Sequence, residues 1–353
     1  LGEYVHESLM PQLHDSLFNS GWDITPYVNV FNSPPENGFQ QFMDHPRYST
    51  GYTTLWNTVG MMVETHMLKP YDKRVEGTYE LLHKMIAIAE KDGNEIRTMR
   101  DTAFASVNAK EYYTTAWKID STKVTNYLFK GYKADTITSE VTGLTRLKYN
   151  REIPIETEVA YKDFYTPSDS VKVPKAYVIG KQWENIINKL DINKITYTTL
   201  KKDSVFNIES YKIENYQAYS SPYEGHYPHY NTTVNAKNIT KEFKAGDIII
   251  PVNQPGFRYL LESLEPAAVD SFFNWNFFDT ILQQKEGFSP YVFEDTALEM
   301  LKNDSILKKE FENERKLNSD FNDNWYQQLD WLFKRSSLYE EAHLQYPVFR
   351  IMN

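Results

Sequence analysis

An apolar run that stops at a glutamate, followed by a helical pattern, constrains the fold of this chain most strongly. Residues 55–63 are mostly apolar and end beside Glu64, which predicts a short buried strand. From residue 71 to residue 90, apolar side chains recur at helical spacing, namely Val75, Tyr79, Leu82, Ile86 and Ala89. A strand, a turn and a helix in this order predict a mixed α/β fold.

The patterns along the 353 residues predict four regions. These are an α/β region over 1–105, a β-rich segment over 106–173, a small α/β domain over 174–293 and a helical carboxyl-terminal region over 294–353. The first region should open with a helix over residues 3–20. The third should contain strands at 176–180 and 195–200 with a helix between them, and a further strand after Gly246. The chain is expected to end in an irregular tail.

Composition narrows the possible partners. The chain has 48 acidic and 38 basic side chains, a formal charge of -10. General attraction to nucleic acid is therefore not expected, because such binding needs clustered Lys and Arg. There is no cysteine, which removes disulfides and thiolate ligands. We find no apolar stretch long enough for a membrane span and no signal peptide in the first residues. Oligomeric state stays open.

Glu64 is the first candidate for catalysis, because loops that bind substrate gather where apolar strands end. A carboxylate there could take a proton from water and pass it to a leaving amine. The competing interpretation is structural, with Glu64 capping the next turn or pairing with Lys69, Lys73 or Arg74. From the residues alone, both interpretations stay open.

Three segments resemble the final third of the catalytic domain of zinc carboxypeptidases. They are the loop from Pro46 to Tyr52, the run from Val59 to His66 and the helix led by Arg74 and Val75. In that family a loop tyrosine covers the substrate, an apolar strand ends in the catalytic glutamate, and a helix comes next. The resemblance implies that Glu64 is the general base.

The same resemblance implies the substrate-binding residues and the fold. Arg47 with Tyr48 or Tyr52 would bind the peptide, and Tyr48 is the better match to the loop tyrosine. Thr65-His66 is similar to a bacterial branch with an added carboxyl-terminal region. The implied fold is the carboxyl-terminal part of a carboxypeptidase-like mixed-sheet domain, and the implied location is periplasmic or secreted. The implied substrate is a peptide or a peptide-like molecule.

The family binds zinc through a His-x-x-Glu pair and a separate histidine, all of which precede the loop tyrosine and the catalytic strand. No such pair occurs here, so the chain offers no metal ligands by this motif. Because the first helix resembles the family's segment after the last zinc histidine, we expect the chain to be truncated, with zinc bound only in a full-length parent. Hydrolysis by this chain alone is then not expected.

Three further groups of residues are candidates for chemistry. His226 and His229 could join Glu224 around a metal, but exposed or hydrogen-bonded loop histidines are the favoured interpretation. The acidic residues Glu262, Glu265 and Asp270 do not define a glycosidase pair, and Glu265-Pro266 indicates a helix boundary. The aromatic residues between positions 270 and 279 predict a packed helix rather than a ligand platform.

Two functional alternatives remain beside the peptidase. The aromatic content of 15% and the missing metal motif are compatible with a non-catalytic protein that binds peptide or glycan. Residues 174–293 contain no Gly-rich phosphate loop, which favours a regulatory or packing unit without chemistry of its own.

Overall fold

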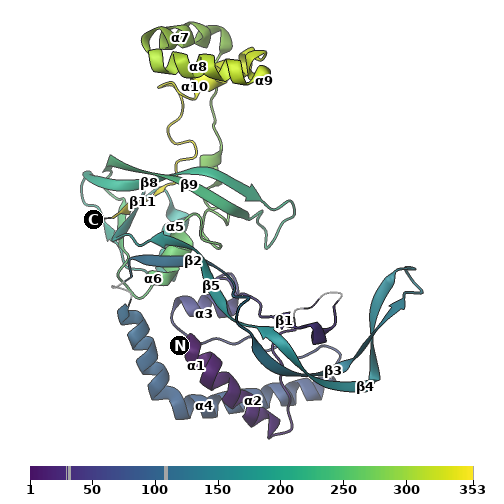
Figure 1. The fold of residues 1–353 in the computed structure, drawn as a ribbon. Coiled ribbons are helices and arrows are strands. Elements are labelled where there is room, and N and C mark those ends of the chain that lie inside the picture. Colours follow the sequence, from purple (N-terminus) through teal and green to yellow (C-terminus); the bar gives the residue numbers. More distant parts are fainter. Residues whose placement is uncertain (29, 31–32, 107–109, 353) are drawn as a thin grey trace.

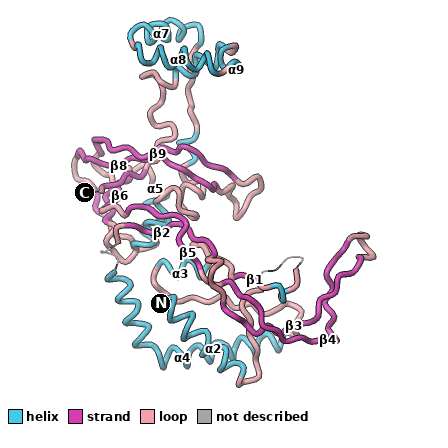
Figure 2. The backbone as a smooth tube through the Cα atoms, in the orientation of Figure 1, coloured by secondary structure: helices cyan, strands magenta, loops and turns pink. Residues whose placement is uncertain are grey.

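The computed structural model describes residues 1–28, 30, 33–106 and 110–352. Helices and three sheets occur in these ranges, so the chain has the mixed α and β structure that the sequence predicts. Figure 1 shows helices and a long hairpin at one end, a sheet unit in the middle and a lobe of helices at the other end. Figure 2 shows that two extended connections join this lobe to the sheet unit.

The predicted amino-terminal helix is confirmed. It consists of α1 (Gly2–Tyr4), a π-helical stretch (Val5–Leu9) and α2 (Met10–Phe18). Leu9, Leu13 and Leu17 are buried in a cluster that includes Leu81 and Ile88 of α4 (Tyr71–Ala105). The four-residue spacing in the sequence thus marks the face that packs on α4.

The helix predicted for residues 71–90 is confirmed and continues to Ala105, but the apolar side chains that recur at helical spacing are exposed. Tyr79 is 67% exposed and Ile86 is 66% exposed. α4 packs instead through Leu81 and Ile88. It therefore has apolar side chains on two sides, of which the described residues cover one.

The strand predicted for residues 55–63 is wrong. The helix α3 (Ser49–Leu55) ends there, and residues 58–66 have no regular secondary structure. Residues 59–65 make no backbone hydrogen bond to any described residue. A strand needs a hydrogen-bonded neighbour, and the described part of the chain supplies none at this segment.

The β-rich segment is confirmed. Its strands are β2 (Tyr112–Ile119), β3 (Thr125–Thr138), β4 (Thr145–Lys162) and β5 (Tyr165–Lys172). β3 and β4 form a long hairpin, and β2 pairs with β5. A 3-10 turn (Pro35–Asn37) precedes β1 (Phe39–Gln40), which pairs in parallel with the end of β4. The first two predicted regions therefore share a sheet.

A six-stranded antiparallel sheet forms the core of the third region. In spatial order it contains β7 (Thr198–Thr199), β10 (Ile248–Pro251), β6 (Ala176–Ile179), β11 (Val348–Ile351), β8 (Ser204–Ala218) and β9 (His229–Phe243). The predicted strands at 176–180 and after Gly246 are confirmed, whereas the strand predicted for 195–200 is limited to two residues.

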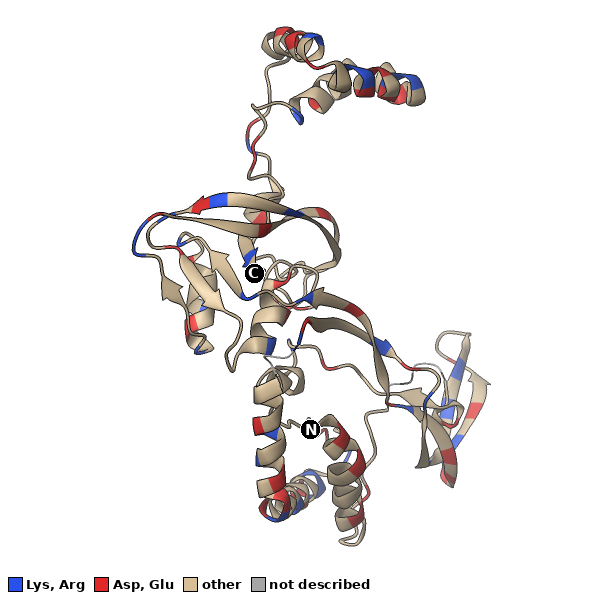
Figure 3. Ribbon diagram, turned by 60° about the vertical axis from the view of Figure 1, so that its left-hand side comes forward, with Lys and Arg blue, Asp and Glu red and all other residues tan. Residues whose placement is uncertain are grey.

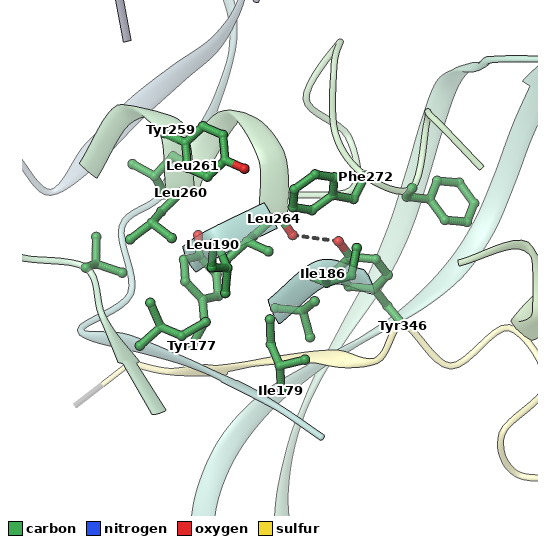
Figure 4. Close-up of a cluster of buried hydrophobic side chains, with 14 of the residues drawn as sticks. Tyr177, Ile179, Ile186, Leu190, Tyr259, Leu260, Leu261, Leu264, Phe272 and Tyr346 are labelled. Atoms are coloured by element: carbon green, nitrogen blue, oxygen red, sulfur yellow. Dashed lines mark hydrogen bonds between the residues drawn. The ribbon is translucent and has the colours of Figure 1, made fainter. Parts of the chain in front are cut away.

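Two helices supply much of the core of this unit. The predicted helix is α5 (Glu184–Ile192), and α6 (Phe257–Leu264) ends at the predicted Glu265 boundary. Figure 4 shows Ile186 and Leu190 of α5 among the side chains of β6 and α6. The Tyr346 hydroxyl donates a hydrogen bond of 2.8 Å to the Leu264 carbonyl, which attaches the last part of the chain to α6.

The predicted boundary at residue 294 requires a correction. After a 3-10 turn (Asp279–Leu282), a helical lobe contains α7 (Pro290–Asn303), α8 (Ser305–Leu317), α9 (Ser319–Asn322) and α10 (Trp325–Phe333). The chain then returns to the sheet, where β11 lies between β6 and β8. The lobe is thus an insertion into the α/β unit, and the predicted irregular tail contains a central strand.

Charged side chains of both signs are distributed over the fold. Figure 3 shows acidic and basic residues interspersed on the same helices and strands. None of the helices in the described ranges is long and apolar enough to cross a membrane.

Candidate functional site

Three of the four predicted site residues line one pocket. Arg47, Tyr48 and Tyr52 face a cavity of about 730 Å³ whose other walls come from the β8–β9 hairpin and from the segment that begins with α6. Glu64 does not line this pocket. The structure therefore brings the predicted substrate-binding residues together but does not place the predicted general base with them.

Arg47 is held by an ion pair. Its Nη2 lies 2.6 Å from Asp270 Oδ1, its Nε donates to the same oxygen at 2.8 Å, and its backbone N–H donates to Oδ2 at 2.8 Å. The guanidinium also lies over the rings of Trp275 and Tyr223, at 5.2 and 5.8 Å from their centroids. With its charge neutralised by Asp270, Arg47 joins the loop to the α/β unit and is poorly suited to bind a peptide carboxylate.

The loop that carries Tyr48 is fixed by short contacts. Thr50 donates a hydrogen bond of 2.6 Å to Asp44. At Gly51, a Cβ would collide with the carbonyl oxygen of His45, so only glycine permits this approach. Burial, together with the Tyr223 hydroxyl, raises the pKa of Tyr48. The Tyr48 hydroxyl therefore stays protonated at neutral pH and can donate a hydrogen bond.

Tyr52 is 42% exposed, and its hydroxyl donates to the Asn193 side chain. Asn193 in turn donates to the Tyr259 hydroxyl at 3.0 Å. Tyr259 is stacked on Trp56, with ring centroids 5.9 Å apart. Tyr52 thus belongs to a network of aromatic and polar side chains at the pocket.

A tight turn forms a second wall. Tyr223 and His226 exchange backbone hydrogen bonds of 2.8 and 3.0 Å across Glu224 and Gly225. Positive φ angles of 49° and 79° at the two central residues are those of a type I′ hairpin turn, which favours Gly225. The turn places Tyr223 and His226 on Trp275, with centroid distances of 6.0 and 5.4 Å.

The aromatic segment 270–279 is packed as predicted, but the predicted helix is wrong, because the segment consists of consecutive turns. Ser271 and Asn274 hydrogen-bond to nearby backbone groups, in competition with helical hydrogen bonds. Asn276 has a φ of 66°, which a helix does not allow. Phe272, Phe273 and Phe278 are buried, while the half-buried Trp275 and Phe277 line the pocket.

Glu262 is the pocket carboxyl with the most perturbed acidity. It lies on α6, and the Tyr113 hydroxyl donates to its Oε1 at 2.8 Å. Burial raises the pKa of Glu262 to about 7, against the smaller opposing effects of Tyr113 and Arg258. Near neutral pH this carboxyl therefore exchanges a proton, and it can act as donor or acceptor towards a ligand.

The two other acidic residues of this region have different roles. Asp270 pairs with Arg47, and Glu265 is buried beside Arg350 of β11, with 3.1 Å between Arg350 Nε and Glu265 Oε1. The Tyr177 hydroxyl donates to Glu265 at 2.6 Å. Glu265 therefore links β6, β11 and α6, and of these three acidic residues only Glu262 is left to face a ligand.

Glu64 lies in the exposed segment and not at the end of a buried strand. The burial that would favour its role as a base is therefore missing from the described structure. The competing interpretation, that Glu64 caps the next turn or pairs with Lys69, Lys73 or Arg74, finds no support either, because none of these contacts occurs among the described residues. Glu64 is accessible for contact with other molecules.

The described residues do not fit a zinc ion. They contain no group of three or more His, Asp or Glu side chains that could hold a metal. His229 is buried against Phe273 and Tyr216, at ring distances of 5.0 and 4.6 Å, whereas His226 faces the pocket. The prediction of exposed or hydrogen-bonded loop histidines is thus wrong for the position of His229, which is buried in β9, although its Nε2 lies 3.2 Å from Asn276 Nδ2.

No protein-family model, curated protein or solved structure matches this chain. The resemblance to zinc carboxypeptidases stays a prediction.

Sequence reasoning missed the pocket-lining roles of Tyr223, His226, Glu262, Trp275 and Phe277. One signal was present, because Glu224-Gly225 between aromatic residues is typical of a tight hairpin turn. The approach of Glu262 to residues 47–52 depends on contacts distant in sequence and had no local signal.

Proposed function

We propose that this chain is the carboxyl-terminal portion of a zinc-dependent carboxypeptidase, with Glu64 as the general base. The observation that carries the proposal is the unpaired segment that ends at Glu64. Val59 and Met61 pack on the cluster formed by α2 and α4, while Met62 on the opposite side is 61% exposed. Such alternation is typical of a strand that lies on a layer of helices.

The backbone of this segment has the hydrogen-bonding capacity that a sheet would use. Residues 59–65 leave their N–H and C=O groups without partners among the described residues. A neighbouring strand would pair these groups and could bury the exposed side chains of Met62 and Val63. Glu64 would then lie at the end of a strand, as the resemblance implies.

The second apolar side of α4 supports the same proposal. A helix that is apolar on two sides is expected between two packing partners. α4 has one partner in α2, and its exposed side includes Tyr79 and Ile86. We infer that additional polypeptide packs around the segment and α4.

The proposal assigns to this chain only proton transfer by Glu64 and contacts of Tyr48 or Tyr52 with the peptide. Arg47 is left out of the substrate-binding set because Asp270 engages its guanidinium. The sequence has no His-x-x-Glu pair, and the described residues form no group of three or more metal-binding side chains, so the proposal assigns the zinc ligands to polypeptide outside these 353 residues. We therefore expect the chain alone to be inactive.

The test uses the longer polypeptide that contains this chain. Release of carboxyl-terminal residues from short peptides should fall roughly 10²- to 10⁴-fold in Glu64→Gln, because general-base catalysis is typically worth that much. Glu90→Gln, on the exposed surface of α4, is the matched control and should keep full activity. Bound zinc and the melting temperature should be the same in both variants. Unchanged hydrolysis in Glu64→Gln would rule out the assigned role.

The second candidate is binding without catalysis, for a peptide or a glycan. It is favoured by the pocket of about 730 Å³, which lies in the size range of small-ligand sites and has aromatic walls. This candidate requires neither Glu64 nor zinc.

A further inference from the structure

The pocket that Tyr48 lines has a second cavity beside it. The adjoining cavity of about 280 Å³ shares Tyr259, Phe272, Trp275 and Phe277 with the first. The combined groove has aromatic rings along its length and a carboxyl at Glu262. An elongated ligand with an apolar stem and one polar end matches this shape.

The charges around the groove are unequal. Arg47 and Asp270 neutralise each other at 2.6 Å. The remaining carboxyls that line the main cavity are Glu262 and Glu224, and His226 is its remaining titratable base. Lys189 lines only the adjoining cavity, with its Nζ 4.7 Å from the Phe277 centroid. The end of the groove at Glu262 therefore favours a positive charge.

Glu262 has room for a further partner. The Tyr113 hydroxyl donates to Oε1, and Arg258 Nε is 3.4 Å from that hydroxyl. Oε2 has no hydrogen-bond partner among the residues that the structure describes. A partly desolvated carboxylate with a free oxygen gains more from a cation than an exposed carboxylate does.

The aromatic wall already accommodates one cation. The Arg47 guanidinium lies 5.2 Å from the Trp275 centroid and 5.8 Å from that of Tyr223, within the range of cation–π attraction. Aromatic rings with a nearby carboxylate are a common means of binding organic ammonium groups. A carboxylate ligand, in contrast, would meet Glu262 and Glu224 at a cavity wall whose arginine is already paired.

We propose that this groove binds an alkylammonium group, as on a lysine side chain, with the ammonium at Glu262 and the stem along Tyr259 and Trp275. The inference deepens the binding function and is independent of Glu64, so that failure of the peptidase proposal leaves it intact. A neutral sugar is the competing ligand, because it would also stack on aromatic rings but would not need the charge of Glu262.

The test compares ligands that differ only in the ammonium group. Binding of Nα-acetyl-lysine methylamide and of Nα-acetyl-norleucine methylamide is measured by calorimetry at pH 8, with hexylamine added to separate a free amine from a peptide. Chitobiose serves as the neutral sugar. The lysine compound should bind at least about tenfold more tightly than the norleucine compound. Hexylamine should also bind if the stem and the ammonium suffice.

Glu262→Gln keeps the shape of the side chain and removes its charge. This variant should lose most of the lysine preference, whereas Glu140→Gln, an exposed residue on the β3–β4 hairpin, should keep it. Because burial raises the pKa of Glu262 to about 7, lysine binding to the wild type should tighten between pH 6 and pH 8. Tyr113, Arg258 and Asp270 also affect this titration, and Glu224 and His226 line the same cavity.

Three outcomes would overturn the proposal. Equal affinities for the lysine and norleucine compounds would remove the role of the ammonium. An unchanged lysine preference in Glu262→Gln would place the cation elsewhere. Tight chitobiose binding that is indifferent to Glu262→Gln would identify a sugar site. Should the variant melt at a markedly lower temperature, the affinities of the wild type for the lysine and norleucine compounds decide instead.

Discussion

The ion pair between Arg47 and Asp270 should be a major support of the contact between the loop and the α/β unit. The perturbation is Asp270→Asn, which keeps the side-chain shape and removes the charge. The Asp270 side chain is 3% exposed and that of Arg47 is 16% exposed, so the pair is largely removed from water. Loss of one partner from such a pair costs about 3–5 kcal/mol.

The lower end of this range applies here. Arg47 keeps some contact with water and also lies over Trp275 and Tyr223, which still stabilise its charge in the variant. We therefore expect Asp270→Asn to lower the free energy of unfolding by about 3 kcal/mol. Arg47→Met should cost a similar amount, because it leaves a buried carboxylate.

Urea unfolding, measured by tryptophan fluorescence, compares both single variants and the double variant. The double variant should be clearly more stable than the sum of the two losses predicts, with a coupling energy of about 2 kcal/mol. If Asp270→Asn costs less than about 1 kcal/mol and the losses simply add, the pair is not a structural link. Arg47 would then be available for substrate binding, as the resemblance implies.

Three other predictions rest on single contacts or backbone angles. Phe349→Ala in β11 should lower the free energy of unfolding by about 3 kcal/mol, because Phe349 is 8% exposed and packs on Phe243. Leu338→Ala, at a 62% exposed position, is the control and should change it by less than about 0.5 kcal/mol. Thermal unfolding of both variants makes the comparison. Gly225→Ala should lower the free energy of unfolding by about 1 kcal/mol, measured by urea unfolding. The loss comes from the φ of 79° alone, since a Cβ there meets no atom within 4 Å. Between pH 4.5 and 7 the folded chain keeps a proton on Glu262 that the unfolded chain releases. The free energy of unfolding of the wild type should therefore fall, relative to that of Glu262→Gln, by at most about 3 kcal/mol as the pH rises through this range. A constant difference between their urea midpoints would contradict the burial of Glu262.

Local patterns predicted the elements with the strongest apolar signals, although their packing partners lie far away in the sequence. The helix with Leu9, Leu13 and Leu17 and the strand Ala176–Ile179 have strong periodic or continuous apolar signals, and both are present. The segment 55–63 has a similar apolar signal but lacks a neighbouring strand in the described structure. An apolar run therefore indicates that its side chains pack against other residues. It forms a strand only where a neighbouring strand supplies hydrogen-bond partners.

Part of the candidate site could be predicted from local sequence motifs. The resemblance selected Arg47, Tyr48 and Tyr52, which meet in one pocket, although Arg47 is engaged by Asp270. Glu262 and the return of β11 into the sheet depend on contacts between residues far apart in the sequence. Such contacts result from the packing of the whole chain and leave little trace in local patterns.

Hydrogen exchange of residues 59–65 tests the central claim most directly. In the 353-residue chain these amides have no hydrogen-bond partner among the described residues, so they should exchange quickly, in contrast to those of β6 and β11. In the longer, zinc-binding polypeptide that we propose, the same amides should be strongly protected, because neighbouring strands would pair with them. Equally fast exchange in both would contradict the proposal that this segment becomes a strand, with Glu64 at its end, in the longer polypeptide.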